Sequence, residues 1–105
     1  MRTPTENINI IRAHLDDDEV LTQLAEEAAE LAQAALKLRR AITGKNPTPI
    51  NEGYALQGLL GEIADVNACV ACASFSNKDY GVMLDLRDYK LERWATRLED
   101  ANQCK

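Results

Sequence analysis

A row of apolar residues at alternating spacings of three and four dominates the first half of the chain. Its members are Leu21, Leu24, Ala28, Leu31, Ala35, Leu38 and Ile42. An α-helix has about 3.6 residues per turn, so this spacing places all of them on one face, which is buried against neighbouring helices. Three aspartates at 16–18 are typical of a helix start, and Gly44 is typical of a helix end. The segment therefore predicts a long amphipathic helix.

Two more segments repeat this design. We expect helices at about residues 51–74, with an apolar row from Leu56 to Val70, and at about 84–103, with a row from Leu84 to Ala101. A short helix is expected near residues 5–14. The breaks between the long helices are TGKNPTPIN at 43–51 and SNKDYG at 76–81, both rich in turn residues. Because no alternating strand pattern is present in these 105 residues, we predict an all-α protein, a helical bundle that forms a single domain over residues 1–105.

Composition excludes several functional classes. The formal net charge is -5, whereas a protein that binds polymeric DNA or RNA presents a basic face to the phosphates. No apolar run approaches the ~18 residues of a membrane-spanning helix, and the N-terminus lacks a signal pattern. The cysteines at 69, 72 and 104 are too few for a disulfide framework. We expect a cytoplasmic protein that binds neither polymeric nucleic acid nor membrane.

Acidic residues are concentrated beside the apolar rows of two predicted helices. At ~100° per residue, Glu27 lies about 60° from the centre of the first row, Glu30 about 120° and Glu26 about 160°. Glu62 and Asp65 flank the second row in the same way. If the two helices are neighbours, four carboxylates converge, and they can all stay ionised only around a cation. Oxygen ligands suit Mg²⁺ or Mn²⁺.

Two other interpretations of these acids have to be weighed. Glutamate is a good helix former, so either pair alone is more simply a solvated surface; two such pairs, each beside an apolar row, favour a metal site. A di-iron centre in a helical bundle requires a Glu-x-x-His motif from each of two helices. The chain has one histidine, His14, and the residue three before it is Ile11. The di-iron alternative is therefore disfavoured.

The acids also form a sequence motif. EEAAE at 26–30, followed by EIAD at 62–65, resembles the EExxE and ExxD pair of the MazG-like, all-α nucleoside triphosphate pyrophosphohydrolases. The flanking stretches QLAEEAAELAQAALKL and LLGEIADVNACV are similar as well, and the resemblance spans roughly residues 20–100. It implies a Mg²⁺-dependent enzyme, with Mn²⁺ as an alternative ion, that hydrolyses a nucleoside triphosphate to the monophosphate and pyrophosphate. Such an enzyme would control a nucleotide pool or remove unwanted nucleotides.

The resemblance also implies roles for individual residues. By motif position, the metal ligands would be Glu27, Glu30, Glu62 and Asp65. Glu26, the first acid of the motif, would be catalytic, since it would assist a second metal ion or orient the attacking water. Divalent cations neutralise phosphate oxygens and activate water, so this chemistry requires no side-chain nucleophile.

Substrate-binding residues are expected on two helices. Gln23 precedes Glu27 by one turn on the same flank and can donate a hydrogen bond to substrate or to a ligand carboxylate. Lys90, Arg93 and Arg97 share one face of the last helix because they are three and four residues apart, and both side-chain types bind phosphate. A solvated face that pairs with neighbouring acids is the alternative for these three cations.

Other conspicuous residues are expected to have structural roles. Cys69 and Cys72 have redox spacing but lie within a predicted helix that no strand precedes, so we expect buried small residues. Trp94 falls on the apolar row of the last helix and is expected to pack in the core, with base stacking as the alternative. His14 is expected at or near the surface, with a contact to the nucleotide base as the alternative.

Two hypotheses for the function remain. The first is a nucleoside triphosphate pyrophosphohydrolase; the alternative is a non-catalytic helical module whose apolar rows bind partner helices. The first long helix would run about 36 Å at ~1.5 Å per residue, which exceeds the core of so small a domain. Part of it is therefore expected to pack on another subunit. The resemblance likewise implies a homo-oligomer, either a dimer or a tetramer, in which a second chain helps to close the base pocket.

Overall fold

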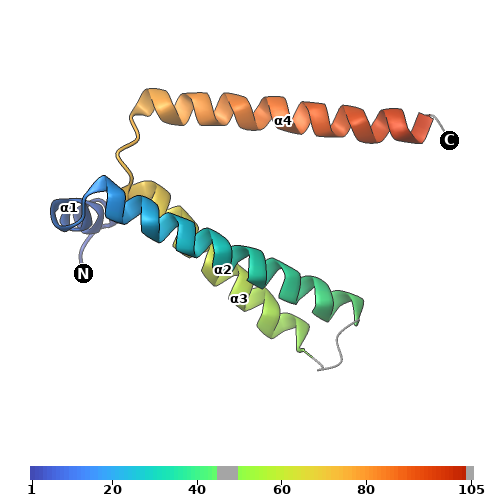
Figure 1. Cartoon of the computed structure of the whole chain (residues 1–105), viewed down its shortest axis with the longest axis horizontal. Coiled ribbons are helices and arrows are strands. Elements are labelled where there is room, and N and C mark those ends of the chain that lie inside the picture. The colour runs from blue at the N-terminus through green and yellow to red at the C-terminus, as the bar shows by residue number, and fades with distance from the viewer. Residues whose placement is uncertain (45–49, 104–105) are drawn as a thin grey trace. The chain divides into compact units, whose positions relative to one another are not determined.

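The computed structural model describes residues 1–44 and 50–103, which form four helices and no strand (Figure 1). The helices are α1 (Pro4–His14), α2 (Asp17–Thr43), α3 (Glu52–Cys72) and α4 (Asn77–Gln103). The prediction of an all-α protein is confirmed, and the first three helices lie where the sequence predicts them. The middle of the predicted break at 43–51 and Cys104 lie outside the described residues.

The chain forms two compact units, Met1–Ala73 and Ser74–Lys105. The first unit contains α1, α2 and α3, and the second contains α4. The expectation that residues 1–105 form one domain stays a prediction.

Local hydrogen bonds explain where the first helices begin and end. The Asp16 side chain accepts a hydrogen bond from the Glu19 amide at 2.8 Å, and the Glu19 carboxylate accepts one from the Asp16 amide at 3.2 Å. This capping box satisfies two amides that the start of α2 would otherwise leave free. Asn51 caps α3 by accepting from the Tyr54 amide at 2.9 Å. Gly44 ends α2 with φ 68°, a left-handed conformation that glycine adopts without strain.

The fourth helix starts about two turns earlier than the sequence predicts. The Ser76 amide donates to the Asp79 carboxylate at 2.9 Å, and the Asp79 amide donates to Ser76 Oγ at 3.1 Å. This reciprocal pair is a helix-capping arrangement, so the segment SNKDYG starts α4 and does not form a separate turn. Gly81, which favoured the turn, lies within the helix.

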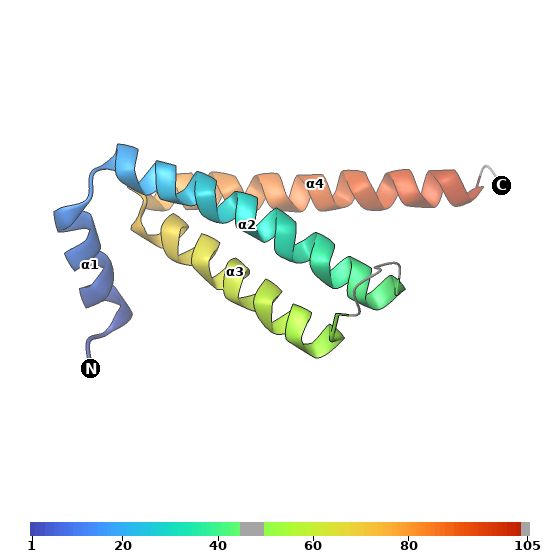
Figure 2. The ribbon, with the colours of Figure 1, turned by 60° about the horizontal axis from the view of Figure 1, so that its bottom comes forward.

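α2 and α3 lie side by side and run in opposite directions (Figures 1 and 2). Their contacting residues, buried or half-buried, recur at alternating spacings of four and three. On α2 they are Val20, Leu24, Glu27, Leu31, Ala34, Leu38 and Ala41, and on α3 they are Ala55, Leu59, Glu62, Val66 and Cys69. Such a seven-residue repeat is typical of helices that pack in coiled-coil fashion. We call this helix pair the hairpin and its contact the seam.

The seam differs from the predicted apolar row by a rotation of α2 about its axis. The leucines at 24, 31 and 38 are shared by both, but Leu21 and Ile42 are 51% and 60% exposed. In the seam, the leucines are accompanied by residues from the opposite flank of α2, among them Glu27, in place of Leu21 and Ile42. The predicted row was therefore wrong in part, because α2 is apolar over more than one face. On α3 the seam likewise differs from the predicted row, because Glu62 is half-buried whereas Leu56 and Ile63 are exposed.

The seam is flanked by one polar and one apolar side, because residues seven apart lie on the same flank of a helix. The polar side carries Gln23, Glu30 and Lys37 of α2 and Gly58 and Asp65 of α3. The apolar side carries Leu21, Ala28, Ala35 and Ile42 of α2 and Leu56 and Ile63 of α3. Matching flanks of two antiparallel helices face the same way, so the hairpin has two chemically different surfaces.

The first helix closes one end of the hairpin. α1 crosses the end where α2 begins and α3 finishes (Figure 2). There Val20, Cys72 and Ala73 are buried together, and Ile8 of α1 packs against them. Because this apolar cluster shields the end of the seam from water, it anchors the first unit.

One described helix, α3, is long and apolar enough to cross a membrane by length and composition alone. The sequence-based expectation concerned uninterrupted apolar runs, and the expectation that the protein does not bind membrane stays a prediction. Glu62 and Asp65 lie within the helix and break its apolar sequence into shorter runs, although the mean hydropathy of the helix remains high. A charged residue near the centre of such a helix costs roughly 2.5 to 3.5 kcal/mol in a bilayer, so the acids oppose insertion.

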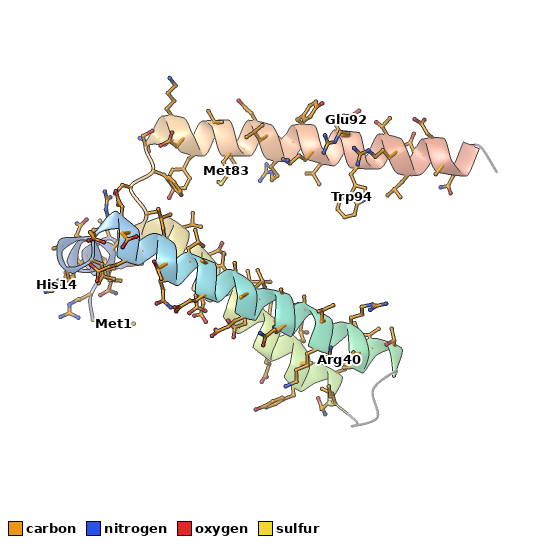
Figure 3. The ribbon with its side chains drawn as sticks, viewed as in Figure 1. Met1, His14, Arg40, Met83, Glu92 and Trp94 are labelled. Atoms are coloured by element: carbon orange, nitrogen blue, oxygen red, sulfur yellow. The ribbon has the colours of Figure 1, made fainter. Side chains whose placement is uncertain are left out.

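In the second unit, α4 is a single amphipathic helix. Figure 3 shows Met83 and Trp94 on one side of α4 and Glu92 on the opposite side. Trp94 is 63% exposed, and Leu91 and Leu98 on the same row are exposed as well. A lone helix has no neighbour in its own unit that could bury this row. The expectation that Trp94 packs in a core therefore stays a prediction, because α4 is the only helix of its unit.

We predict opposite effects on stability for alanine at two glycines. At Gly44, alanine would be held at φ 68° and should lower the free energy of unfolding by about 1 to 2 kcal/mol. At Gly61, within α3, an added Cβ meets no atom within 4 Å. Alanine there should raise the free energy of unfolding by about 0.5 to 1 kcal/mol, because alanine has a higher helix propensity than glycine. Urea denaturation followed by circular dichroism measures both. Stabilisation by Gly44→Ala would contradict the left-handed helix end.

Candidate metal centre

Three carboxylates meet on the polar side of the seam. Glu27 and Glu62 occupy corresponding seam positions on the two helices of the hairpin, and Glu30 lies one turn after Glu27 on the polar flank. Each of the three offers one oxygen, and these oxygens all lie within 4.8 Å of one another. α2 supplies two of the groups and α3 the third, so the site exists only because the helices pair in this register. We call these residues the acid cluster.

The hydrogen bonds of the cluster are incomplete. Gln23 Nε2 donates to Glu27 Oε1 at 2.8 Å, which fixes one face of that carboxylate. The other oxygen, Glu27 Oε2, is buried without a hydrogen-bond partner, and so is Glu62 Oε2. Burial of an unpaired carboxylate oxygen is costly, and buried charges in proteins are normally paired or coordinate a metal. Two unpartnered carboxylate oxygens, on residues whose carboxylates lie close together, therefore fit a cation site.

The electrostatics of the cluster also favour a cation. The negative charge of Glu27, followed by a hydrogen bond with it and by desolvation, raises the pKa of Glu30 above the ordinary value. The pKa of Glu62 is raised first by burial and then by the charges of Glu30, Asp65 and Glu27. Both shifts express the cost of placing like charges together in a partly desolvated site. A bound divalent cation would remove that cost.

Hard divalent cations suit this donor set best. All three ligands are carboxylates, which Mg²⁺ and Mn²⁺ prefer, whereas zinc sites are usually built from histidine and cysteine. Mg²⁺ is commonly held by one or two carboxylates together with water and substrate phosphates. Three carboxylates can therefore hold it and leave positions for phosphate.

The structure brings together three of the four predicted metal ligands. Asp65 is exposed and outside the group, but its charge contributes to the raised pKa of both Glu30 and Glu62. Gln23 contacts a ligand carboxylate, as the sequence suggested. Glu26 is exposed and not part of the acid cluster.

The predicted phosphate-binding cations belong to the other unit. Lys90, Arg93 and Arg97 lie on α4, where all three are exposed. The Arg93 guanidinium lies 5.9 Å from the centre of the Tyr89 ring. Lys90 lines an apolar groove of about 830 Å³ along α4, together with Trp94. Their role toward a substrate stays a prediction.

Lys37 and Arg40 were missed by the sequence analysis. Both line a pocket of about 530 Å³ on the polar side of the hairpin, which Glu30 and Glu62 also line. A signal was present, since Lys37 follows Glu30 by seven residues, as Glu30 follows Gln23. Cations in the last turns of a helix also interact favourably with its dipole, so this spacing by itself does not identify a binding site.

Two cysteines lie near the end of α3, the helix that carries Glu62. Cys72 is buried and Cys69 half-buried, and both are free thiols, as expected from the sequence. Burial and then the charge of Glu27 raise the pKa of the Cys69 thiol, which keeps it protonated and unreactive. His14 is exposed, and its Nδ1 lies 2.8 Å from the Ile10 carbonyl oxygen of its own helix.

Comparisons of the chain with protein-family models, with curated proteins and with solved structures found no match.

We predict that the acid cluster makes metal-free stability depend on pH. A carboxyl whose pKa is raised by folding stabilises the folded state while it is protonated, below its ordinary value of 4.5, and this contribution is lost as the pH rises through the raised pKa. With EDTA present, the Tm of the wild type should fall relative to that of Glu62→Gln as the pH rises from about 4.5 toward neutrality. Thermal melts followed by circular dichroism test this.

The exposed Glu26 provides the matched control. Glu26→Gln should follow the wild-type pH profile, because this residue lies outside the cluster. Addition of millimolar Mg²⁺ should raise the Tm of the wild type more than that of Glu62→Gln. If the wild-type and Glu62→Gln curves run parallel over the whole pH range, the three carboxylates do not interact as described.

Proposed function

We propose that this chain is a MazG-like nucleoside triphosphate pyrophosphohydrolase that requires Mg²⁺ and accepts Mn²⁺. The observation that carries the proposal is the acid cluster, in which carboxylates from two helices meet within 4.8 Å and two of their oxygens are buried without partners. These carboxylates belong to the EEAAE and EIAD segments that resemble the family motif. The proposed fold is the helical bundle of that family, with helices shared across a dimer.

In this proposal, four acids hold the metal. Glu27, Glu30 and Glu62 would be ligands from the polar side of the seam, and Asp65 would complete the set from the flank of α3. When bound, Mg²⁺ would neutralise phosphate charge and make water a better nucleophile. Gln23 would hold Glu27 in its ligating orientation through the 2.8 Å hydrogen bond.

The reaction is the attack of water on the α-phosphorus. The bond between that phosphorus and the oxygen bridging to the β-phosphate breaks, and the products are a nucleoside monophosphate and pyrophosphate. Glu26 would assist a second metal ion or orient the water, since it lies at the exposed edge of the same helix. Lys90, Arg93 and Arg97 of α4 would bind the substrate.

The free thiols and the acidic net charge suit a cytoplasmic enzyme that acts on free nucleotides and not on polymeric nucleic acid or membranes. The biological role would be pool control or removal of unwanted nucleotides.

The alternative, a non-catalytic interaction module, is favoured by one observation. The apolar side of the hairpin leaves Leu21, Ile42 and Leu56 exposed, as a partner-binding helix pair would. The two functions differ in their response to metal. Only the enzyme should gain thermal stability from millimolar Mg²⁺.

We predict that a panel of canonical and modified nucleoside triphosphates contains substrates that the wild type converts to monophosphate and pyrophosphate in the presence of Mg²⁺. Glu30→Gln should retain the fold but lose nearly all turnover, because loss of one anionic ligand weakens metal binding. Chromatography of nucleotides and a separate pyrophosphate assay measure both products. The matched control is Glu19→Gln, which alters an exposed acid of α2 outside the cluster.

Two outcomes of this experiment would contradict the proposal. Wild-type turnover in Glu30→Gln would remove the metal-site assignment. Release of orthophosphate and diphosphate would show that a different phosphoanhydride bond is cleaved.

We predict that the working unit is a homo-oligomer, most simply a symmetric dimer, with the apolar side of the hairpin in its interface. Isologous interfaces bury the same surface on both subunits. Light scattering at micromolar concentration should give a mass well above the 11.6 kDa of one chain, and Ile63→Glu should lower it by placing charge in the interface. Fully active wild-type protein at the mass of a single chain would show that no second subunit is needed.

A further inference from the structure

The polar side of the hairpin continues from the acid cluster into a pocket with separated charges. The pocket has a volume of about 530 Å³, and Glu30 and Glu62 line it at the end next to the cluster. Lys37 and Arg40 line it further along α2. Lys37 is about 10 Å from Glu30 along the helix axis, so the cations and the acids occupy different parts of the pocket.

The two cations are available for an anion. Neither Lys37 nor Arg40 forms an ion pair with a described carboxylate. Lys37 Nζ lies 5.9 Å from the centre of the Tyr54 ring, which orients the ammonium group without neutralising it. Three small residues also line the pocket, Ala34, Ala55 and Gly58, so that space between the helices is left open.

We propose that this pocket binds the β- and γ-phosphates of the substrate, with Lys37 and Arg40 as their contacts. The inference rests on the proposed function and adds the direction in which the triphosphate lies along α2. A metal-bound triphosphate has a cation at the scissile end and free anionic oxygens beyond it, which matches carboxylates followed by an ammonium and a guanidinium. The leaving pyrophosphate then points toward the end of α2, and the nucleoside points toward Gln23 and the start of α2.

Cations also occur in the last turns of helices because they interact favourably with the helix dipole. Substitution of Arg39 distinguishes the dipole interaction from phosphate binding. Arg39 lies beside Arg40 in the same turn but does not line the pocket. Arg39→Ala removes the same dipole interaction and leaves the pocket intact. It is therefore the matched control.

The test uses the full chain and inorganic pyrophosphate with Mg²⁺, measured by isothermal titration calorimetry. Lys37→Ala and Arg40→Ala should each weaken pyrophosphate binding by about tenfold, the effect expected from loss of one charge-assisted contact. Arg39→Ala should bind as the wild type does. All three residues are exposed, so the variants should fold, and circular dichroism checks this.

Three results would overturn the inference. Wild-type affinity in both Lys37→Ala and Arg40→Ala would show that the pocket does not hold phosphates. Loss of affinity in Arg93→Ala alone would place the phosphates on α4. Failure of the wild type to bind pyrophosphate at millimolar concentration would also exclude the site.

The proposed function is tested separately in the same series. Turnover of triphosphates without any effect of Lys37→Ala on pyrophosphate affinity would leave the enzyme assignment standing and remove the subsite. If pyrophosphate binding depends on Lys37 but no triphosphate is turned over, the phosphate site stands and the enzyme assignment is removed. In an active enzyme, Lys37→Ala should raise KM and the inhibition constant of pyrophosphate by the same factor.

Discussion

Two half-buried glutamates in the seam between α2 and α3 are the main constraint on the structure of the first unit. Glu27 and Glu62 occupy positions that an ordinary helix pair would fill with leucine or alanine, and each leaves one carboxylate oxygen buried without a partner. Such an arrangement costs stability in the absence of a cation. The rest of the seam offsets that cost, because apolar residues on either side and the cluster around Val20 and Cys72 hold the helices in register.

The hairpin has two unlike surfaces because the two flanks of the seam carry different types of residue. Once glutamates enter the seam, neighbouring positions on one flank can contribute further polar groups to the same site, as Glu30 and Lys37 do. The opposite flank is then free to be apolar. Within the first unit that side is exposed, at Leu56 and Ile63 for example. In the second unit, α4 has an apolar row and no other helix to cover it. A surface of this kind on both units is consistent with the proposed association of chains.

Most of the fold could be predicted from local signals in the sequence. The capping pair of Asp16 and Glu19 and the left-handed Gly44 define the bounds of α2, and both act within a few residues. The α4 start was misplaced for a local reason as well, because Ser76 and Asp79 were taken as turn residues when they form a cap. The acids of the site were recognisable because their spacing of three on two helices, each beside apolar residues, is unusual for a solvated surface.

The sequence by itself determined the helices, the candidate ligands and the unequal distribution of charge along α2. Only the tertiary structure decided which face of α2 meets α3. The sequence leaves this open because Leu24, Leu31 and Leu38 belong equally to two apolar faces, and one of those faces includes Glu27. Packing against α3 selects the face with the glutamate, and the same rotation places Lys37 and Arg40 beside the acids. Contacts between residues distant in sequence determine such a rotation, and helical periodicity alone does not contain them.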